Sequence, residues 1–197
     1  AAAHPALTRL LAPGVRQHVA AAAAAAALAE RVQGALRRTL RSELLAESRK
    51  HKASKLLRQI PCIGPIRAAR LVALMQTPHR FRSKRQLWTY SGLGMETHDS
   101  AQYRFVRGEL QRAKKPQQIR GLNRNHNHEM KDIFKGAANR ASCGVGPLRD
   151  FYLALLDKGM KPEMARLTLA RKIAAIALTL WKKEERFNAE HLKTQAA

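Results

Sequence analysis

The polar segment GMETHDSAQYRFVRG at residues 94–108 contains the densest group of reactive side chains in this sequence. Ser100 and Tyr103 are candidate nucleophiles, and His98 and Asp99 are candidate proton acceptors. A serine hydroxyl attacks phosphate effectively only when a base removes its proton and cations stabilise charge on the equatorial oxygens. The segment therefore predicts either attack on a phosphate through Ser100 or a basic loop that only binds a phosphate backbone.

Cations that suit a phosphate lie within this segment and just after it. Arginine holds phosphate oxygens through a planar fork of donors, so Arg104 and Arg107 are candidates to hold a scissile phosphate. Lys114 and Lys115 follow in the stretch RAKKPQQIRG and are candidates for contacts with the flanking backbone. Two alternatives stay open at this point: Ser100 is incidental in a binding loop, or Tyr103 is the nucleophile.

The stretch IPCIGPIRAARLVALM at residues 60–75 places a short Pro and Gly turn between two apolar runs and predicts a helix-hairpin-helix. Free backbone amides at such a turn and at the start of the second helix can hold a phosphate without reading base sequence. The usual turn has a glycine where this chain has Cys62, and a helical turn with a purely structural role is the alternative. The candidate DNA-binding residues here are Ile63, Gly64, Arg67 and Arg70.

The charge balance indicates the class of partner. The sequence has 37 Lys and Arg against 14 Asp and Glu, a formal net charge of +23, and such a field attracts polyanions. The basic residues are spread from Arg9 to Lys193, which favours nucleic acid, DNA first, over a membrane surface. The alanine-rich tract Val19–Ala29 is short and weakly apolar for a bilayer span, and two cysteines favour a reducing cytosol. We therefore expect DNA as partner, no membrane, and a cytoplasmic, nucleoid-associated protein.

A metal site is not predicted. The stretch NRNHNHE at residues 123–129 contains His126 and His128, which on a helix would point about 200° apart and could not share an ion. We expect a polar helix that faces DNA instead. Five carboxylates could in principle build a two-metal nuclease, but nothing in their spacing selects one. They are Glu96, Asp99, Glu109, Glu129 and Asp132.

The predicted fold is mainly α-helical, beginning with a long helical arm. The chain from Val15 to Leu57 has no proline and one glycine, so residues 1–57 are expected to form one arm. An apolar residue recurs every fourth position, at Leu28, Val32, Leu36, Leu40 and Leu44. A stripe this narrow needs a cover, which is either a partner helix in a coiled-coil-like oligomer or the chain's own domain.

Residues 58–185 are expected to form a helical domain, with the helix-hairpin-helix at 56–75 and a flexible tail at 186–197. Further helices are predicted at 66–76, 83–90 with Ser83 as N-cap, 119–141, 148–158 with Gly159 as cap, and from Pro162 onward. The segment at 95–107 is predicted to be irregular or a short hairpin, and 112–121 a loop. The buried side of the last helix is predicted to comprise Met164, Leu167, Ile173, Ile176, Leu180 and Trp181.

Four blocks together resemble a known family: LLRQIPCIGPIRAARLVALM, FRSKRQLWTYSGLG, the Ser100 segment, and GMKPEMARLTLARKIAAIALTLWKK. They are similar to the C-terminal half of insertion-sequence transposases of the IS116/IS110/IS902 type, over roughly Lys55 to Lys183. The resemblance implies a largely helical domain in which a serine, here Ser100, forms a phosphoserine link to DNA during strand exchange. Members of the family commonly have glycine soon after this serine, whereas this chain has Ala101 and Gln102.

The same resemblance carries expectations about cofactors and partners. It implies an N-terminal RNase H-like (RuvC-like) domain with four acidic ligands for Mg²⁺, a long helical arm, oligomers, and a structured guide RNA. The acidic domain has no counterpart in this sequence, so we expect no cofactor on this chain and Mg²⁺ only in that domain. The chain alone is then expected to bind DNA without recombining it. A non-catalytic helix-hairpin-helix DNA-binding module is the alternative.

Overall fold

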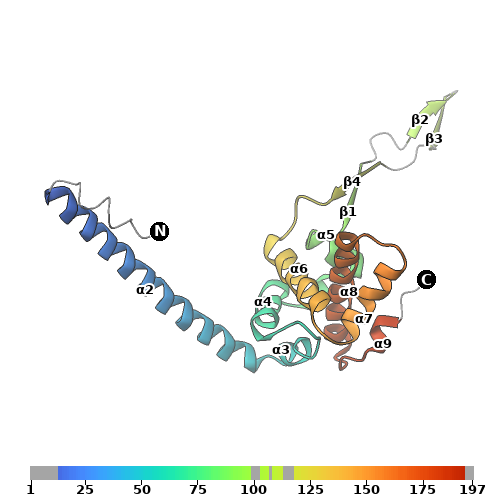
Figure 1. Cartoon of the computed structure of the whole chain (residues 1–197). Coiled ribbons are helices and arrows are strands. Elements are labelled where there is room, and N and C mark those ends of the chain that lie inside the picture. Colours follow the sequence, from blue (N-terminus) through green and yellow to red (C-terminus); the bar gives the residue numbers. More distant parts are fainter. Residues whose placement is uncertain (1–12, 99–102, 107, 113–117, 194–197) are drawn as a thin grey trace. The chain divides into compact units, whose positions relative to one another are not determined.

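A computed structural model describes residues 13–98, 103–106, 108–112 and 118–193. The chain divides into two compact units, residues 1–46 and 47–197. The described part of the first unit is helical and belongs to helix α2 (Pro13–Lys50), whose last four residues, 47–50, are counted with the second unit (Figure 1). The expected helical arm is thus present, but its helix ends at Lys50, and a separate helix begins after His51.

Helix α2 carries the predicted apolar stripe on its surface. The five stripe side chains have exposed fractions between 36% and 61%. Within Gln17–Lys50, an 18-residue window meets the length and composition criteria for a bilayer span, with a mean hydropathy of 1.2. The alanine tract Val19–Ala29 is too short for such a span by itself, and the longer helix supplies the rest of the window. Helices of water-soluble proteins pass the same criteria, so the finding alone does not indicate a membrane.

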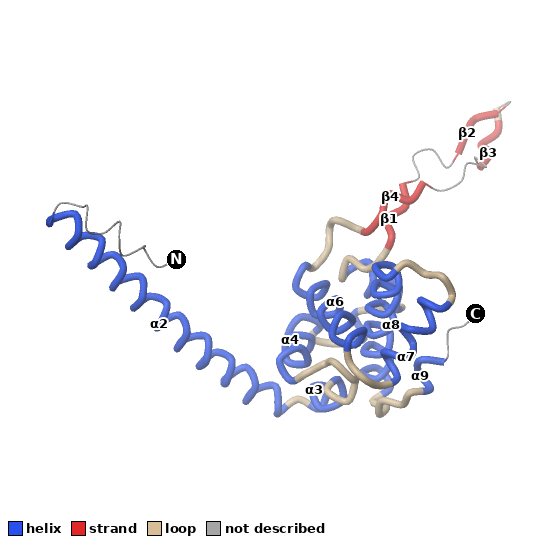
Figure 2. Tube along the Cα trace, viewed as in Figure 1, coloured by secondary structure: helices blue, strands red, loops and turns tan. Residues whose placement is uncertain are grey.

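The second unit is a helical bundle built around α8 (Figure 2). Helix α8 (Pro162–Lys183) packs against α3, α5, α6 and α7, and its side chains Leu169, Ile173 and Leu180 are fully buried. Lys52 pairs with Glu184 and ties the first helix of the unit to the end of α8. The helical elements are α3 (Lys52–Leu57), α4 (Pro65–Met75), η1 (Pro78–Arg80), α5 (Lys84–Tyr90), α6 (His128–Cys143), α7 (Pro147–Asp157), α8 (Pro162–Lys183) and α9 (Glu190–Lys193).

Four short strands lie between α5 and α6 in the chain. β1 (Met95–His98) pairs antiparallel with β4 (Gln118–Leu122), with a bulge between Glu96 and Thr97. β2 (Tyr103–Val106) pairs antiparallel with β3 (Glu109–Arg112). The prediction of a hairpin in this region is confirmed, but the paired strands extend to residue 122, far beyond the expected end at 107.

The helix predicted at 119–141 and the loop predicted at 112–121 are wrong at their shared boundary. Ile119 and Gly121 belong to β4, and the helix α6 begins only at His128. Gly121 has φ 104°, which no helix allows, and Asn127 caps α6 by accepting a hydrogen bond from the Met130 amide. Pairing between strands whose partners lie 20 to 27 residues apart in sequence therefore overrides the local apolar spacing.

The remaining helix predictions are confirmed closely. Ser83 caps α5 through a hydrogen bond from the Gln86 amide, Gly159 follows α7 with φ 80°, and Pro162 opens α8. One predicted core residue is wrong: Met164 is 47% exposed. It lies in the first turn of α8 and lines an open cavity between this turn and α6.

Candidate nucleic-acid interface

The turn between α3 and α4 is tightly folded onto the core. The amide of Ile60 donates to the Leu57 carbonyl, and the amide of Ile63 donates to the Ile60 carbonyl. Ile60 and Ile63 are 1% and 2% exposed, so both isoleucines anchor the turn from inside. The predicted site residue Ile63 therefore contributes its backbone, since its side chain is buried.

Cys62 occupies the conformation that a glycine would favour. Its φ is 71°, in the left-handed region, where a side chain costs about 1–2 kcal/mol. Arg67 Nη1 donates a 3.0 Å hydrogen bond to the Cys62 carbonyl and so supports this conformation. Burial raises the pKa of the Cys62 thiol, against the smaller opposing influence of Arg140 and Arg67. The thiol thus remains protonated and acts as a packing group.

The start of α4 is open to a ligand. Gly64 is the N-cap and has no side-chain hydrogen bond, and Pro65 occupies the first helical position. Both residues are exposed. Helix N-termini with uncapped amides attract anions, and α4 is long enough, at 11 residues, to have this property.

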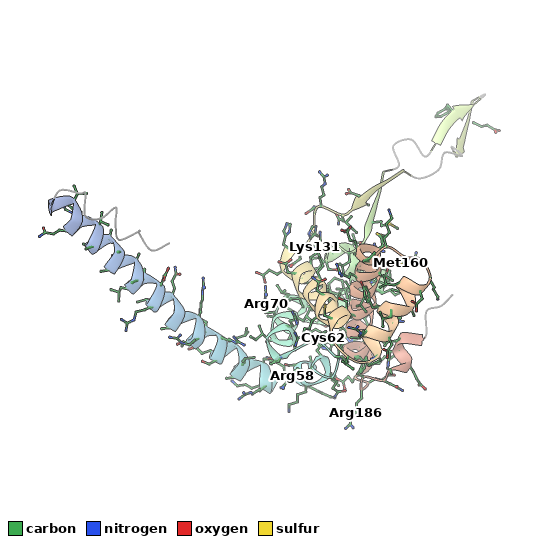
Figure 3. The ribbon with its side chains drawn as sticks, viewed as in Figure 1. Arg58, Cys62, Arg70, Lys131, Met160 and Arg186 are labelled. Carbon is green, nitrogen blue, oxygen red and sulfur yellow. The ribbon has the colours of Figure 1, made fainter. Side chains whose placement is uncertain are left out.

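The two predicted arginines of this turn are engaged within the domain. Arg67 packs beside Gly136 of α6, where an added Cβ would lie 3.1 Å from Arg67 Nη2. Arg70 Nη2 lies 3.3 Å from Glu129 Oε2, and both side chains remain partly exposed (Figure 3). Each guanidinium has five donors, so both arginines retain capacity for a phosphate in addition to these contacts.

The strands β1 to β4 together form the β segment, and its base is held against the end of α5 by hydrogen bonds. Gly92 has φ 65°, and a Cβ added to it would lie 2.4 Å from the His126 ring, so only glycine fits here. The amide of Asn127 donates to the Tyr90 carbonyl at 2.9 Å. Asn123 donates its backbone amide to the Gly94 carbonyl at 3.0 Å and its side-chain amide to the Thr89 carbonyl at 3.1 Å. The two ends of the β segment are therefore held together by backbone and asparagine contacts.

A half-buried arginine of α8 also supports this base, and the sequence analysis missed it. Arg171 Nε donates a 2.7 Å hydrogen bond to the Leu93 carbonyl. Its own carbonyl accepts a 2.9 Å hydrogen bond from Trp88 Nε1. Burial lowers the pKa of Arg171 from its usual value. The only advance signal was a polar residue on the buried side of a strongly apolar helix.

The geometric argument used above for the histidines is wrong, because His126 precedes α6 instead of lying within it. The rings of His126 and His128 lie 4.4 Å apart, and Lys131 Nζ is 3.2 Å from His126 Nε2. His126 Nδ1 is buried without a hydrogen-bond partner. Among the described residues, no three His, Cys, Asp or Glu side chains gather as a metal site needs, so Mg²⁺ does not fit them.

Most of the residues predicted to attack or hold the phosphate lie outside the described ranges. Ser100, Asp99, Arg107, Lys114 and Lys115 all lie outside the residues that the structure describes. The described strands flank them, since β1 ends two residues before Ser100 and β2 begins three residues after it.

The backbone of β2 carries two of the predicted residues. Tyr103 is paired with Arg112 and Arg104 with Gln111. Phe105, next in the strand, is 76% exposed, which is unusual for a large aromatic side chain. A two-stranded ribbon with an exposed aromatic residue and several arginines in its sequence has the composition of a nucleic-acid contact.

Comparison with known proteins locates the same part of the chain. Residues 54–122 match the family described as Transposase IS116/IS110/IS902 family. The chain is also 25% identical, over 144 residues, to a protein of Streptomyces clavuligerus named "Insertion element IS116 uncharacterized 44.8 kDa protein". That alignment covers 73% of this chain and 33% of the relative, so the chain spans about a third of the length of the curated relative it matches. The matched region contains the α3–α4 turn and all four strands.

Proposed function

We propose that the chain is the DNA-binding part of a mobile-element transposase, because residues 54–122 match the IS116/IS110/IS902 transposase family. In the complete protein, Ser100 attacks a DNA phosphate during transposition and recombination. The observation that carries this proposal is the family match itself, because it includes both the phosphate-binding turn and the Ser100 segment.

The proposed step is a transesterification. The Ser100 hydroxyl forms an O–P bond with the scissile phosphate while the P–O bond to a deoxyribose oxygen breaks, and that oxygen leaves with a proton. The serine proton passes to a base, for which His98 and Asp99 are the nearest candidates in sequence. Arg104 and Arg107 hold the phosphate oxygens as negative charge develops on them. No step in this scheme uses a metal bound to the described residues.

The α3–α4 turn positions the duplex in this proposal, as a helix-hairpin-helix. The uncapped start of α4 at Gly64 receives a backbone phosphate, and Arg70 contributes charge beside it. Arg67 has a double role, since it also stabilises the left-handed backbone at Cys62. Lys114 and Lys115 contact the backbone that flanks the cleavage point.

The partners follow the same logic. DNA is implied by the transposase family, and a structured guide RNA is a second polyanion that a chain of charge +23 attracts. We assign the exposed stripe of α2, centred on Leu36, to pairing with the same helix of a second copy in a homo-oligomer. The protein then acts in the cytoplasm, associated with the nucleoid.

A non-catalytic DNA-binding module is the second candidate. It is favoured by the internal contacts of Arg67 and Arg70, which have a structural use without any chemistry. In that case Ser100→Ala leaves every property of the protein unchanged.

One experiment separates the two. The chain is mixed with Mg²⁺, a nicked suicide duplex, and the acidic RNase H-like domain of a full-length family member, and peptides are analysed by mass spectrometry. We expect a phosphodiester adduct on the Ser100 peptide, absent from Ser100→Ala and retained in the matched variant Tyr103→Phe. An adduct on Tyr103 overturns the serine assignment. Binding without any adduct in the completed system supports the module. Without the acidic domain, strand transfer should not exceed that of Ser100→Ala.

A further inference from the structure

Lys172 is a buried cation in the middle of α8. Only 7% of its surface is exposed, and lysine is almost never buried this deeply unless it is paired. Its Nζ lies 5.9 Å from the centre of the Phe151 ring, a cation–π contact that compensates only part of the lost hydration. No carboxylate forms an ion pair with Lys172 within the part of the chain that the structure describes.

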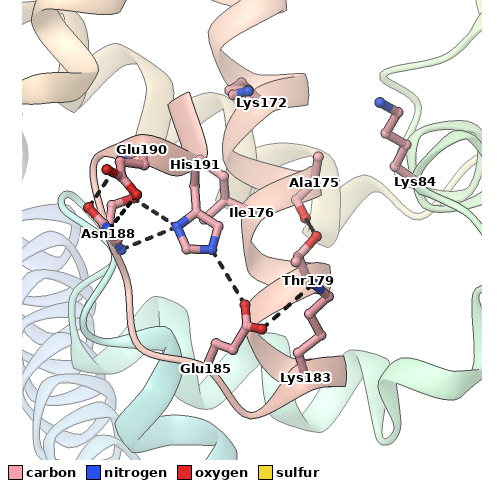
Figure 4. Close-up of a pocket in the computed structure, with 10 residues that line it drawn as sticks. All are labelled: Lys84, Lys172, Ala175, Ile176, Thr179, Lys183, Glu185, Asn188, Glu190 and His191. Atoms are coloured by element: carbon pink, nitrogen blue, oxygen red, sulfur yellow. Dashed lines mark hydrogen bonds and ion pairs between the residues drawn. The ribbon is translucent and has the colours of Figure 1, made fainter. Parts of the chain in front are cut away.

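Lys172 lines a cavity of about 390 Å³ (Figure 4). Lys84, the first residue of α5, lines the same cavity, together with Thr179, which lies two turns after Lys172 on the same face of α8. Burial, and secondarily the charge of Lys84, lower the pKa of Lys172. The two ammonium groups therefore repel each other, and the cavity that both side chains line is large enough for a phosphate.

The carboxylates of this cavity are engaged at its other end. Glu185 lies 3.6 Å from Lys183 Nζ and 3.7 Å from His191 Nε2. Glu190 accepts a 3.1 Å hydrogen bond from the side-chain amide of Asn188. The part of the cavity lined by Lys84 and Lys172 is called the lysine end below.

We propose that the lysine end of this cavity binds a backbone phosphate of DNA between Lys84 and Lys172. An anion with several oxygens can accept from both ammonium groups at once, which removes their repulsion and gives Lys172 the counter-ion that its burial requires. Phosphate in a DNA strand is the anion that this chain meets as a transposase, so the inference rests on the proposed function. The cavity lies on α5, α8 and the segment leading to α9, and it adds a DNA contact distinct from the α3–α4 turn and the Ser100 segment.

The decisive variant is Lys172→Met, which removes the charge and keeps the length of the side chain. A residue with a structural role only would lower the melting temperature when changed. For a phosphate ligand we expect the reverse combination: the melting temperature of Lys172→Met stays at or above that of the unaltered chain, while DNA affinity falls. Lys84 is only partly buried, so the variant Lys84→Gln gives a second test that does not depend on core packing. The matched control is Lys158→Met, an exposed lysine at the end of α7 that lies outside the cavity.

DNA affinity is measured by fluorescence anisotropy with a labelled duplex over a range of salt concentrations. Loss of one phosphate contact should reduce the slope of log affinity against log salt by about 0.9. If both lines meet at 1 M salt, binding at 0.1 M is weaker by about eightfold, which is that slope change over one decade. Lys172→Met and Lys84→Gln should each show this change, and Lys158→Met much less.

The outcomes are distinguishable. If the unaltered chain does not bind duplex DNA, the proposed function fails and this inference fails with it. If the chain binds but both cavity variants match Lys158→Met, only the cavity assignment is overturned. Loss of affinity for a guide RNA alone, with DNA slopes unchanged, also overturns it. A fourth outcome also overturns the inference: inorganic phosphate, at fixed ionic strength, raises the melting temperature, but the variants keep the salt slope of the unaltered chain for DNA. The cavity then binds free phosphate and not the DNA backbone.

Discussion

Replacing Cys62 tests whether the backbone of the α3–α4 turn is strained, as its φ of 71° indicates. At φ 71° any residue with a Cβ is disfavoured by about 1–2 kcal/mol, and glycine is not. Glycine costs about 0.5–1 kcal/mol in extra unfolded-state entropy relative to alanine. Both Cys62→Gly and Cys62→Ala lose the half-buried thiol, so that loss cancels in their comparison. We therefore expect Cys62→Gly to be the more stable variant by about 0.5–1 kcal/mol.

Urea denaturation followed by circular dichroism measures this difference, since equal slopes in the two variants make the midpoints directly comparable. The matched control is the same pair at Cys143, the last residue of α6, where the backbone is helical. There the helix preference reverses the order, and alanine should be the more stable by up to about 1 kcal/mol. If Cys62→Ala equals or exceeds Cys62→Gly, the left-handed conformation at Cys62 is wrong.

Three further predictions concern the base of the β segment, the exposed aromatic residue and the buried lysine. Gly92→Ala should destabilise the protein by about 1–3 kcal/mol, and adding His126→Ala should recover part of that loss in a double-mutant cycle, because the added Cβ would lie 2.4 Å from the His126 ring. Phe105→Ala should weaken binding of single-stranded or unpaired DNA by about 1 kcal/mol or more, about fivefold, while Phe105→Trp retains it. Burial lowers the pKa of Lys172 in the folded chain. At pH values between this lowered pKa and the usual 10.5, the unfolded chain therefore binds more protons than the folded one. The free energy of unfolding should therefore rise with pH through that window, and this increment, measured as the difference from Lys172→Met, should be lost as the pH falls through it.

Local sequence signals predicted the helical part of the second unit well. Ser83, Gly159 and Pro162 each act within one turn of their own position, as a cap, a stop and a first-turn residue. Their structural effect depends only on the backbone of residues next to them in sequence, so a local sequence pattern is enough to predict it. For the same reason the turn near Gly64 could be predicted as a helix connection.

The β segment shows where local reading fails. Residues Gln118–Leu122 contain an apolar spacing that suits the following helix, yet they pair with Met95–His98 instead. That pairing is selected by contacts distant in sequence, such as Gly92 against His126, and no local pattern encodes them. The histidine argument failed with it, because it assumed that His126 was helical.

The residues that support the candidate site were missed for a related reason. Arg171 and Lys172 read in sequence as two polar interruptions of an apolar helix, and a charged residue there is usually taken as part of the solvated face. In the structure Lys172 is buried and Arg171 is half-buried, and the two side chains contact different partners.

These two adjacent residues connect α8 to two of the proposed DNA contacts. Arg171 donates to the Leu93 carbonyl at the base of the β segment, and Lys172 lines the cavity proposed to bind phosphate. Successive residues on a helix are about 100° apart, so one rigid helix serves two separate surfaces at the same height along its axis. A phosphate drawn toward Lys172 therefore acts on the same turn of α8 that holds the strand leading to Ser100. If the proposed function holds, α8 aligns the duplex and the nucleophile segment with each other, even though neither of its two residues contacts the reacting atoms.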